Sequence, residues 1–396
     1  MRSLRSSPLG QVLTISGHDG RFGEDYEVEA FIPHDLPDQV TLPSATWMAM
    51  TDAAAELGRL DAAASLIPRP QLVARVAMRR EAIGTSALEG TYADLTELFA
   101  AEVLPEDERD AHVAPNVREV INYTRAADAA FAWIQERPIT IGMIGELQAQ
   151  IVRGTPSDGP EAGAIRTSQV FIGAKHRRVE EARFVPPPPG DQLRSMCERW
   201  VRWLTAPDPR RQIQLVARLA MAHYQFETLH PFTDGNGRLG RLVVVLQMLE
   251  EGVLRSPVLA VSPWLEERAD AYRDHLFAVS ESGDWTPWIE FFAEAVATEA
   301  RSGHDRIMRL LALRDEIGTA VREARPRARL AVEIADDLIA FPILSVADAN
   351  RRYGRSNQAN RDAVATLVEL GVLEPYGDSR YDRLYWNPRV FQVIER

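Results

Sequence analysis

The sequence of 396 residues predicts a mainly α-helical protein. Apolar residues recur at helical spacing over most of the chain, whereas two short runs, 27–32 and 169–172, are strand-like. After residue 334 the pattern changes to short elements separated by glycine. Helices are expected at 45–57, 71–83, 116–135, 138–152, 191–205, 209–229, 264–276, 286–296 and 292–325.

Local signals mark where several of these helices begin and end. Ser44 is a suitable N-cap for the first helix, and Pro68 and Pro70 separate it from the second. Pro287 fits the first turn of a later helix, where its missing N–H has no cost. The acidic, proline-bounded segment 104–115 is a candidate linker.

Composition and charge exclude several classes of protein. The hydrophobic content of 45% is that of a globular chain, and the length suits two or three domains. A net charge of −12 provides no global basic field for nucleic acid. The one cysteine, Cys197, excludes an internal disulfide framework. Without a membrane-length apolar run or a signal-peptide core, we expect a cytoplasmic protein with no membrane partner.

The segment 230–241, His-Pro-Phe-Thr-Asp-Gly-Asn-Gly-Arg-Leu-Gly-Arg, combines residues that suit phosphate chemistry. It opens with an ionisable base, His230, and a carboxylate, Asp234. Its glycine-rich turn leads into an apolar stretch that predicts a buried helix from near Gly237. Free N–H groups at a helix N-terminus attract anions, and two closely spaced arginines suit phosphate. The segment therefore predicts a base and a metal carboxylate beside a polyphosphate site.

The same segment resembles the signature of the Fic family, His-x-Phe-x-(Asp/Glu)-Gly-Asn-Gly-Arg-x-x-Arg. Every fixed position is matched, by His230, Phe232, Asp234, Gly235, Asn236, Gly237, Arg238 and Arg241. Fic enzymes typically transfer AMP from ATP to a protein hydroxyl. The resemblance implies a protein adenylyltransferase whose partners are ATP and a target protein, with the chain itself as one candidate target.

The resemblance also implies a role for each residue. His230 would be the general base, and Asp234 would bind Mg²⁺ that accompanies ATP as substrate. The nucleotide phosphates would be bound by Gly235, Asn236, Gly237, Arg238 and Arg241. Family cores usually draw adenine contacts from the region after the motif, where Tyr272 is a candidate and a core aromatic is the alternative.

Residues 84–90, Gly-Thr-Ser-Ala-Leu-Glu-Gly, indicate a surface turn when taken alone. Thr85 and Glu89 are four positions apart, and Gly90 suits a helix stop. Beside the Fic signature they resemble the family's inhibitory motif, (Ser/Thr)-x-x-x-Glu-(Gly/Asn). The resemblance implies that Glu89 pairs with Arg241 and competes with the γ-phosphate of ATP.

A β-hairpin is expected at 166–189, with a turn at Gly173 and a polyproline exit. Beside the Fic core it resembles the flap, which would bind the target edge to edge. Its basic end, Lys175 to Arg178, would attract an acidic target or is a solvated turn. The target-binding residues would be Gln169, Val170, Phe171, Ile172 and Gly173.

His230 follows the end of the helix at 209–229. A helix C-terminus favours a protonated imidazole, so a base at this place needs a further feature that the sequence does not reveal. His223, within the same helix, is interpreted as a structural hydrogen-bonding residue rather than a catalytic one.

Residues 335–396 predict two short helices and a hairpin, which resemble a winged helix-turn-helix. Basic side chains there would touch DNA phosphates, or the module would serve only protein contacts. The candidate phosphate contacts are Arg351, Arg352, Arg355 and Arg361.

Four domains are expected: 1–112 with the inhibitory motif, a Fic core at 113–295, a helical connector at 296–334 and the winged helix at 335–396. Three alternatives to AMP transfer stay open. They are the reverse reaction, de-AMPylation, using Glu89; DNA binding by a regulator; and transfer of a different phosphate-containing group. A homodimer is also an open option.

Overall fold

A computed structural model gives the structure of the chain and describes residues 4–67, 69–105, 113–174, 177–206, 213–377 and 383–395. Its contacts divide the chain into two compact units. The first comprises Met1–Glu56, Asn122–Val253 and Trp264–Thr298; the second comprises Leu57–Ile121, Leu254–Pro263 and Glu299–Arg396. The four expected domains stay a prediction.

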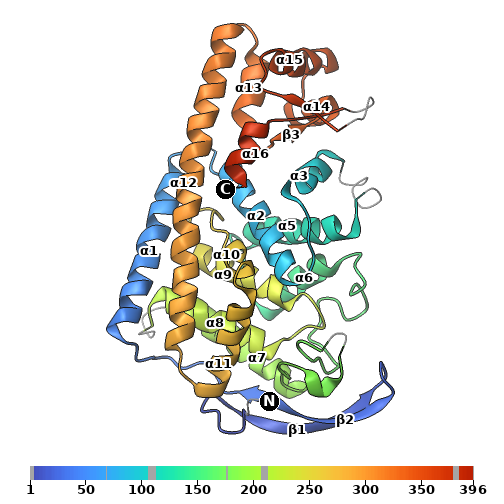
Figure 1. Cartoon of the computed structure of the whole chain (residues 1–396), viewed down its shortest axis with the longest axis vertical. Coiled ribbons are helices and arrows are strands. Elements are labelled where there is room, and N and C mark those ends of the chain that lie inside the picture. Colours follow the sequence, from blue (N-terminus) through green and yellow to red (C-terminus); the bar gives the residue numbers. More distant parts are fainter. Residues whose placement is uncertain are drawn as a thin grey trace. The chain divides into compact units, whose positions relative to one another are not determined.

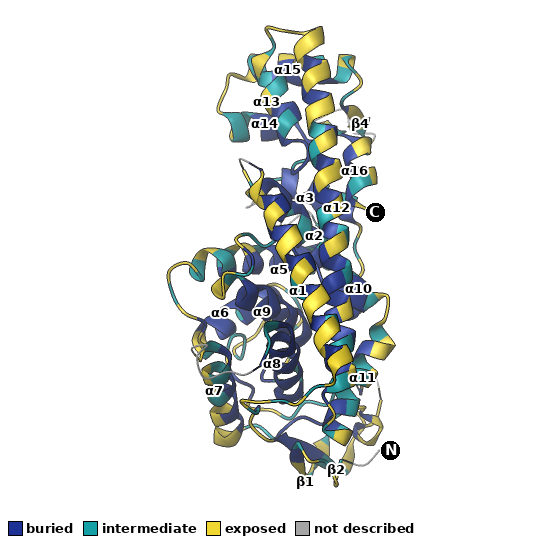
Figure 2. Cartoon of the chain, turned by 90° about the vertical axis from the view of Figure 1, so that its left-hand side faces the viewer, coloured by how far each residue is buried: buried dark blue, intermediate teal, exposed yellow. Residues whose placement is uncertain are grey.

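Within the described ranges, four helices contain residues of both units: α1 Ser44–Ser65, α5 Pro115–Trp133, α10 Ser262–Glu266 and α12 Thr286–Ala324. Figure 2 shows that α1 and α12 each carry a long exposed stripe beside buried positions. This is the pattern of amphipathic helices that bury one face.

The first unit is built around two buried helices, α8 Leu215–Leu229 and α9 Asn236–Glu250. Both are almost entirely buried in Figure 2. Around them lie α6 Ile141–Val152, α7 Asp191–Thr205, α11 Ala269–Ser282, the 3-10 helix η1 Val179–Glu181 and a hairpin of β1 Gly10–Asp19 with β2 Glu24–Pro33.

The second unit contains α2 Gln71–Leu88, α3 Leu95–Val103, α13 Arg329–Asp337, α14 Val346–Tyr353, α15 Asn357–Glu369 and α16 Pro388–Ile394. Its antiparallel sheet has the order β3-β5-β4, formed by β3 Ile343–Leu344, β4 Glu374–Tyr376 and β5 Leu384–Trp386. Figure 1 shows α13 to α16 around β3. These elements agree with the order expected of a winged helix-turn-helix, which stays a proposal.

The predicted mainly α class is confirmed, and most helix signals are correct. Ser44 opens α1, and α9 begins one residue before Gly237. Two boundaries are wrong: 286–296 and 292–325 form the single helix α12, and 264–276 is divided between α10 and α11. Helix α8 begins at Leu215, and residues 209–212 of the helix expected at 209–229 lie outside the described residues. Pro68, most of the linker and the hairpin tip at 378–382 lie outside the described residues.

Strand predictions were less complete. The run 27–32 lies in β2, but its partner β1 was missed because its apolar alternation is weak and glycines interrupt it. Gly17 in β1 has a packing reason, since a Cβ there would lie 2.5 Å from the Tyr26 hydroxyl. The strand expected at 169–172 is wrong as an element, because Ile172 pairs with Phe184 only as an isolated bridge.

Helix α2 packs closely on the short segment Ser262–Pro263 of its own unit. A Cβ on Gly84 would lie 2.7 Å from the Pro263 nitrogen and 2.9 Å from the Ser262 carbonyl carbon. The buried Glu81 carboxylate accepts hydrogen bonds from the N–H of Ser262, at 2.9 Å, and from its hydroxyl. Glycine at position 84 therefore permits a backbone approach that any side chain would block.

Gly84→Ala should lower the free energy of unfolding by about 1–3 kcal/mol, the usual cost of overpacking. The matched control is Gly58→Ala in α1, where a Cβ meets nothing within 4 Å. That change should raise stability by about 0.5–1 kcal/mol, since alanine loses less entropy in a helix. Chemical denaturation of both variants is the measurement, and similar shifts for the two would contradict the packing argument.

Candidate functional site

His230 stands at the C-terminal end of α8 in a left-handed conformation, with φ 48° and ψ 61°. Among the described residues it is the only non-glycine with positive φ. Its N–H donates to the Phe226 carbonyl at 2.9 Å, and its Nδ1 lies 3.3 Å from the Glu227 carbonyl oxygen. Because a carbonyl oxygen only accepts, this contact places the ring proton on Nδ1 and leaves Nε2 as a proton acceptor.

The loop after His230 is closed by Asn236. The Asn236 side chain accepts from the Phe232 N–H at 2.9 Å and donates to the Phe232 carbonyl at 2.8 Å. Both residues are buried, so this pair of bonds fixes the shape of the loop. A nucleotide contact of Asn236 stays a prediction. Its side chain already makes two hydrogen bonds to the backbone of the loop.

The glycine-rich turn leads directly into α9. Gly235 is the N-cap, with φ 78°, and its N–H donates to Asp234 Oδ1 at 2.7 Å. The first N–H groups of an α-helix have no acceptor within the helix, so the turn offers an anion site at Asn236 and Gly237. Arg238 and Arg241, both buried, follow on α9.

Helices α8 and α9 approach each other closely at Gly240. A Cβ at this position would lie 2.8 Å from Glu227 Oε1 and 2.9 Å from a ring carbon of Phe226. The signature leaves this position variable, yet here the helix crossing requires glycine. The crossing places the end of α8 beside the beginning of α9, which brings His230 and the predicted phosphate site onto one loop.

Asp234 is held by two residues that sequence reasoning did not select. The Ser157 hydroxyl donates to Asp234 Oδ2 at 2.6 Å, and the Gln148 side chain donates to the Asp234 carbonyl at 3.0 Å. Gln148, buried in α6, also accepts from the Gly163 N–H at 2.6 Å. The Asp234 side chain remains about half exposed, at 46%. A carboxylate so placed suits Mg²⁺, which takes one or two protein oxygens together with phosphates and water.

Arg166 is a third residue that the sequence did not single out. Its guanidinium is buried and donates to backbone carbonyls on both sides of the flap and at the end of α8. Burial lowers the pKa of Arg166 to about 10, so the side chain stays protonated at neutral pH. Every residue type has a backbone carbonyl, so no sequence motif indicates which side chain will donate to such carbonyls.

The flap is a narrow hairpin with little strand structure. Ile172 N–H donates to Phe184 O at 3.0 Å, and Arg183 N–H donates to Ile172 O at 2.8 Å. Gly173 has φ 83°, as the predicted turn requires. Lys175 and His176 lie outside the described residues, and Arg178 forms an ion pair with Glu24 at 2.8 Å.

The β1–β2 hairpin supports the flap from one side. One buried cluster joins strand β2 to the flap segment, and Tyr26 packs edge-on against Phe171 with ring centroids 5.2 Å apart. The N–H of Phe31 donates to the Val185 carbonyl at 2.9 Å. The five predicted target-binding residues, 169–173, are therefore part of a braced segment, and their contact with a target stays a prediction.

Tyr272 and His223 form a buried pair. The Tyr272 hydroxyl lies 2.7 Å from His223 Nε2, and the two rings stack with centroids 5.9 Å apart. This supports the structural interpretation of His223 and the core interpretation of Tyr272, whose adenine contact stays untested. Burial first, and then the charge of Arg241, lowers the pKa of His223 to about 3.

The residues of the inhibitory motif occupy the end of α2 in the second unit. Thr85 is buried, whereas Glu89 is the exposed C-cap of the helix. Gly90 has φ 88°, with its N–H donating to Ala87 O and the Thr91 N–H donating to Ser86 O, each at 2.9 Å. These two bonds form a Schellman motif, so the predicted helix stop at Gly90 is confirmed.

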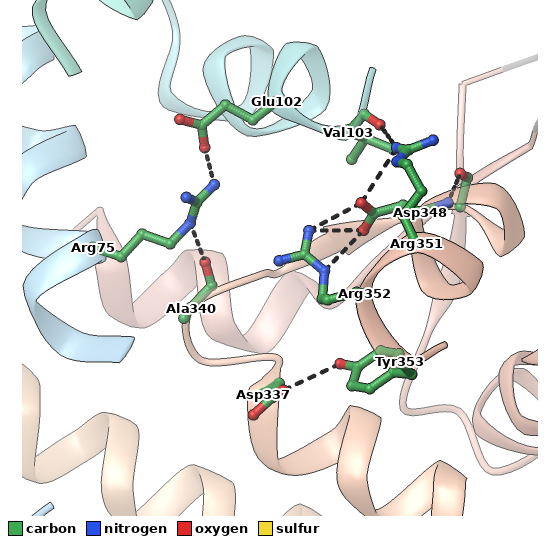
Figure 3. A network of polar contacts seen from close by, with 10 residues as sticks. Arg75, Glu102, Val103, Asp337, Ala340, Asp348, Arg351, Arg352 and Tyr353 are labelled. Atoms are coloured by element: carbon green, nitrogen blue, oxygen red, sulfur yellow. Dashed lines mark hydrogen bonds and ion pairs between the residues drawn. The ribbon is translucent and has the colours of Figure 1, made fainter. Parts of the chain in front are cut away.

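The basic residues of the C-terminal region divide into two pairs. Arg351 donates to the Val103 carbonyl, and Arg352 forms an ion pair with the buried Asp348 at 2.8 Å (Figure 3). Arg355 and Arg361 are exposed. Two of the four candidate DNA contacts therefore already have partners within their own unit, and DNA binding stays a prediction.

Fold and site together define a helical protein with a base and an anion-binding turn on one loop. Two family models match the chain: "Fic/DOC family N-terminal" over residues 47–132 and "Fic/DOC family" over residues 138–248. The chain belongs to the Fic/DOC family. The second match contains the whole segment 230–241 and the flap, and the first contains residues 85–90.

Relatives and solved structures agree with this assignment. The chain is 32% identical over 161 residues to the protein adenylyltransferase Fic of Drosophila ananassae, covering 41% of this chain and 28% of that protein. The chain is 31% identical to the protein adenylyltransferase Fic of Drosophila melanogaster, and that match covers 41% of this chain and 29% of that protein. The match therefore spans less than a third of either relative.

A Fic family protein of Desulfovibrio desulfuricans G20 has a similar fold, with a TM-score of 0.54 and 20% identity. The alignment covers 89% of this chain and 98% of that one. Within the described residues, none of the helices has the length and apolar character needed to cross a membrane.

The buried His223 predicts a pH-dependent stability. Its pKa is about 3 in the folded chain and 6.5 when unperturbed, so between these values the unfolded chain binds more protons. Stability should fall as the pH drops, by about 2 kcal/mol between pH 7 and pH 5 from this residue alone. Urea unfolding of wild type and His223→Gln at both pH values measures this. Equal losses in the two proteins would refute it.

Proposed function

We propose that this protein is a protein adenylyltransferase that transfers AMP from Mg-ATP to a hydroxyl side chain of a target protein. The observation that carries the proposal is the loop between α8 and α9. There a histidine whose Nδ1 lies beside the Glu227 carbonyl precedes a glycine turn, a helix N-terminus and two buried arginines. The names of the relatives support it.

In the proposed reaction the hydroxyl oxygen of the target attacks the α-phosphorus of ATP. A new oxygen–phosphorus bond forms, the bond to the leaving oxygen of pyrophosphate breaks, and the hydroxyl proton passes to His230 Nε2. Positioning and charge stabilisation provide most of the catalysis in such transfers. The N–H groups of the turn and the arginines Arg238 and Arg241 would bind the phosphates.

Asp234 would hold the Mg²⁺ that accompanies ATP, and the ion would neutralise phosphate charge. Ser157 and Gln148 support this role because they fix the orientation of the carboxylate and of its backbone. Metal ligands commonly depend on such neighbouring hydrogen bonds.

We further propose that Glu89 inhibits the enzyme by pairing with Arg241. Arg241 cannot serve both a carboxylate and the γ-phosphate of ATP in full, so pairing would leave the α-phosphorus badly placed for attack. The inhibitory role is supported by the match of Thr85, Glu89 and Gly90 to the family motif and by the helix stop that exposes Glu89 at the end of α2.

Glu89→Gly should raise the transfer of label from α-labelled ATP at least tenfold, because Arg241 then serves only the γ-phosphate, and a factor of ten corresponds to about 1.4 kcal/mol of activation free energy. Adding His230→Ala should remove the gain, since loss of a general base costs about 10²–10⁴-fold. Adding Arg241→Ala should remove it as well, because the γ-phosphate then loses its ligand.

Two other outcomes would redirect the proposal. If Glu89→Gly is no more active than wild type, while wild type removes AMP from a modified target, the protein is a de-AMPylase that needs Glu89. If label is transferred from β-labelled but not from α-labelled nucleotide, a different phosphate-containing group is the one transferred.

A further inference from the structure

Arg166 makes contacts that join the flap to the loop of the base. Its Nε donates to the His230 carbonyl at 2.8 Å, and its backbone N–H donates to the Pro231 carbonyl at 2.9 Å. The two terminal nitrogens of the guanidinium donate to Ser168 O at 3.1 Å and to Pro187 O at 2.5 Å. Ser168 and Pro187 lie at the bases of the two arms of the flap.

The same guanidinium also lies at the C-terminal end of α8. One terminal nitrogen is 3.5 Å from the Leu229 carbonyl, in addition to the bond from Nε to His230 O. The last carbonyls of a helix carry partial negative charge, and a cation there offsets it. This is the feature beside His230 that the sequence did not reveal.

Only arginine can make all of these bonds. Its planar guanidinium presents five N–H donors in a fixed geometry, whereas lysine presents three donors around one nitrogen. The acceptors are all backbone carbonyls of the flap, the loop and α8. Removing the side chain would leave these carbonyls without this donor, and the contacts with Pro187 O and Leu229 O are buried.

We propose that Arg166 is a positioning residue that holds the flap in register with His230. This proposal rests on the proposed function. A target segment bound along the flap would reach His230 only while Arg166 joins the flap to the loop that contains His230. It acts through the flap and the His230 backbone and touches neither nucleotide nor target.

The test uses Arg166→Met and the milder Arg166→Lys in the full chain carrying Glu89→Gly. The expected result is ATP affinity within about twofold of the parent by calorimetry, because the phosphate ligands remain. Label transfer should fall at least tenfold, and amide exchange at 168–173 and 184–185 should become faster. Arg166→Lys should recover part of both losses.

Arg218→Met is the matched control. Arg218 is also buried, but it lies in the first turn of α8 and pairs with Glu251 at the end of α9, so its loss should lower the melting temperature without changing flap exchange. The proposal is overturned if a folded Arg166 variant keeps both the transfer rate and the flap exchange of its parent. If the Glu89→Gly parent itself transfers no label, the proposed function has failed, and exchange alone still decides whether Arg166 holds the flap.

A separate set of contacts, within the second unit, joins α2 to residues 329–395, here called the C-terminal module. Arg75 of α2 donates to the Ala340 carbonyl at 3.1 Å and forms an ion pair with Glu102 of α3 (Figure 3). Its guanidinium also lies 4.6 Å from the centre of the Phe341 ring, a favourable cation–π distance. The module therefore holds the N-terminal half of α2.

Further contacts extend this attachment along α2 and α3. Arg80 donates to the Ile394 carbonyl at 2.6 Å, one turn before the inhibitory motif. Phe99 of α3 packs edge-on against Phe391 of α16, with ring centroids 5.8 Å apart. In Figure 3, Arg351 of the module reaches back to the Val103 carbonyl at the end of α3.

We infer that the C-terminal module is a clamp that keeps α2, and with it Glu89, in the inhibiting position. The inference rests on the proposed inhibition, because α2 ends in Glu89. Displacing the module would free α2 and raise AMP transfer.

The double variant Arg75→Met/Arg80→Met tests the clamp in the full chain. Label transfer should rise at least tenfold when Glu89 is present and should not rise further in the Glu89→Gly background. The control is Arg389→Met, which removes an exposed arginine of α16 that pairs with Glu316 of α12 rather than with α2. It should leave transfer unchanged.

Unchanged transfer in the double variant, beside an active Glu89→Gly protein, would refute the clamp and leave the proposed function intact. A rise in the double variant that persists in the Glu89→Gly background would also refute it, since the effect would not act through Glu89. If the double variant does not fold, the single change Arg80→Met tests the same contact next to the motif.

Discussion

The close crossing of α8 and α9 is the constraint on which the candidate site depends. Gly240 lets the two helices approach until a side-chain carbon would touch Glu227 and Phe226. The chain must then leave α8 and enter α9 within a few residues, and it does so through the left-handed His230 and the left-handed Gly235. A base and a helix N-terminus are brought together because the loop between them has no room to separate them.

The loop is held by buried side chains that bond to the backbone rather than to one another. Asn236 closes it from within, Gln148 supports it from α6, and Arg166 ties it to the flap. Buried backbone groups need partners, and a fully paired network is rigid. The proposed base His230 and the proposed metal ligand Asp234 stay partly accessible on this loop.

Helix α2 combines two properties in one element of the second unit. Its C-terminal end is terminated sharply by the Schellman motif at Gly90, which fixes the position of Glu89 relative to the helix. Other residues of α2 form hydrogen bonds with α3, with the Ser262–Pro263 segment and with the C-terminal module. A carboxylate on so firmly held a helix is well suited to control, because its position changes only when the whole helix moves.

The sequence by itself determined the helical class, the segment 230–241, the stop at Gly90 and the start of α9 near Gly237. These depend on neighbours in the chain, so spacing alone reveals them. Only the tertiary structure showed that β1 pairs with β2 and that Ser157 donates to Asp234. It also showed that Arg351 and Arg352 already bond to Val103 and Asp348. It alone identified Arg166, because its acceptors are backbone carbonyls, which every residue has and no sequence pattern can distinguish.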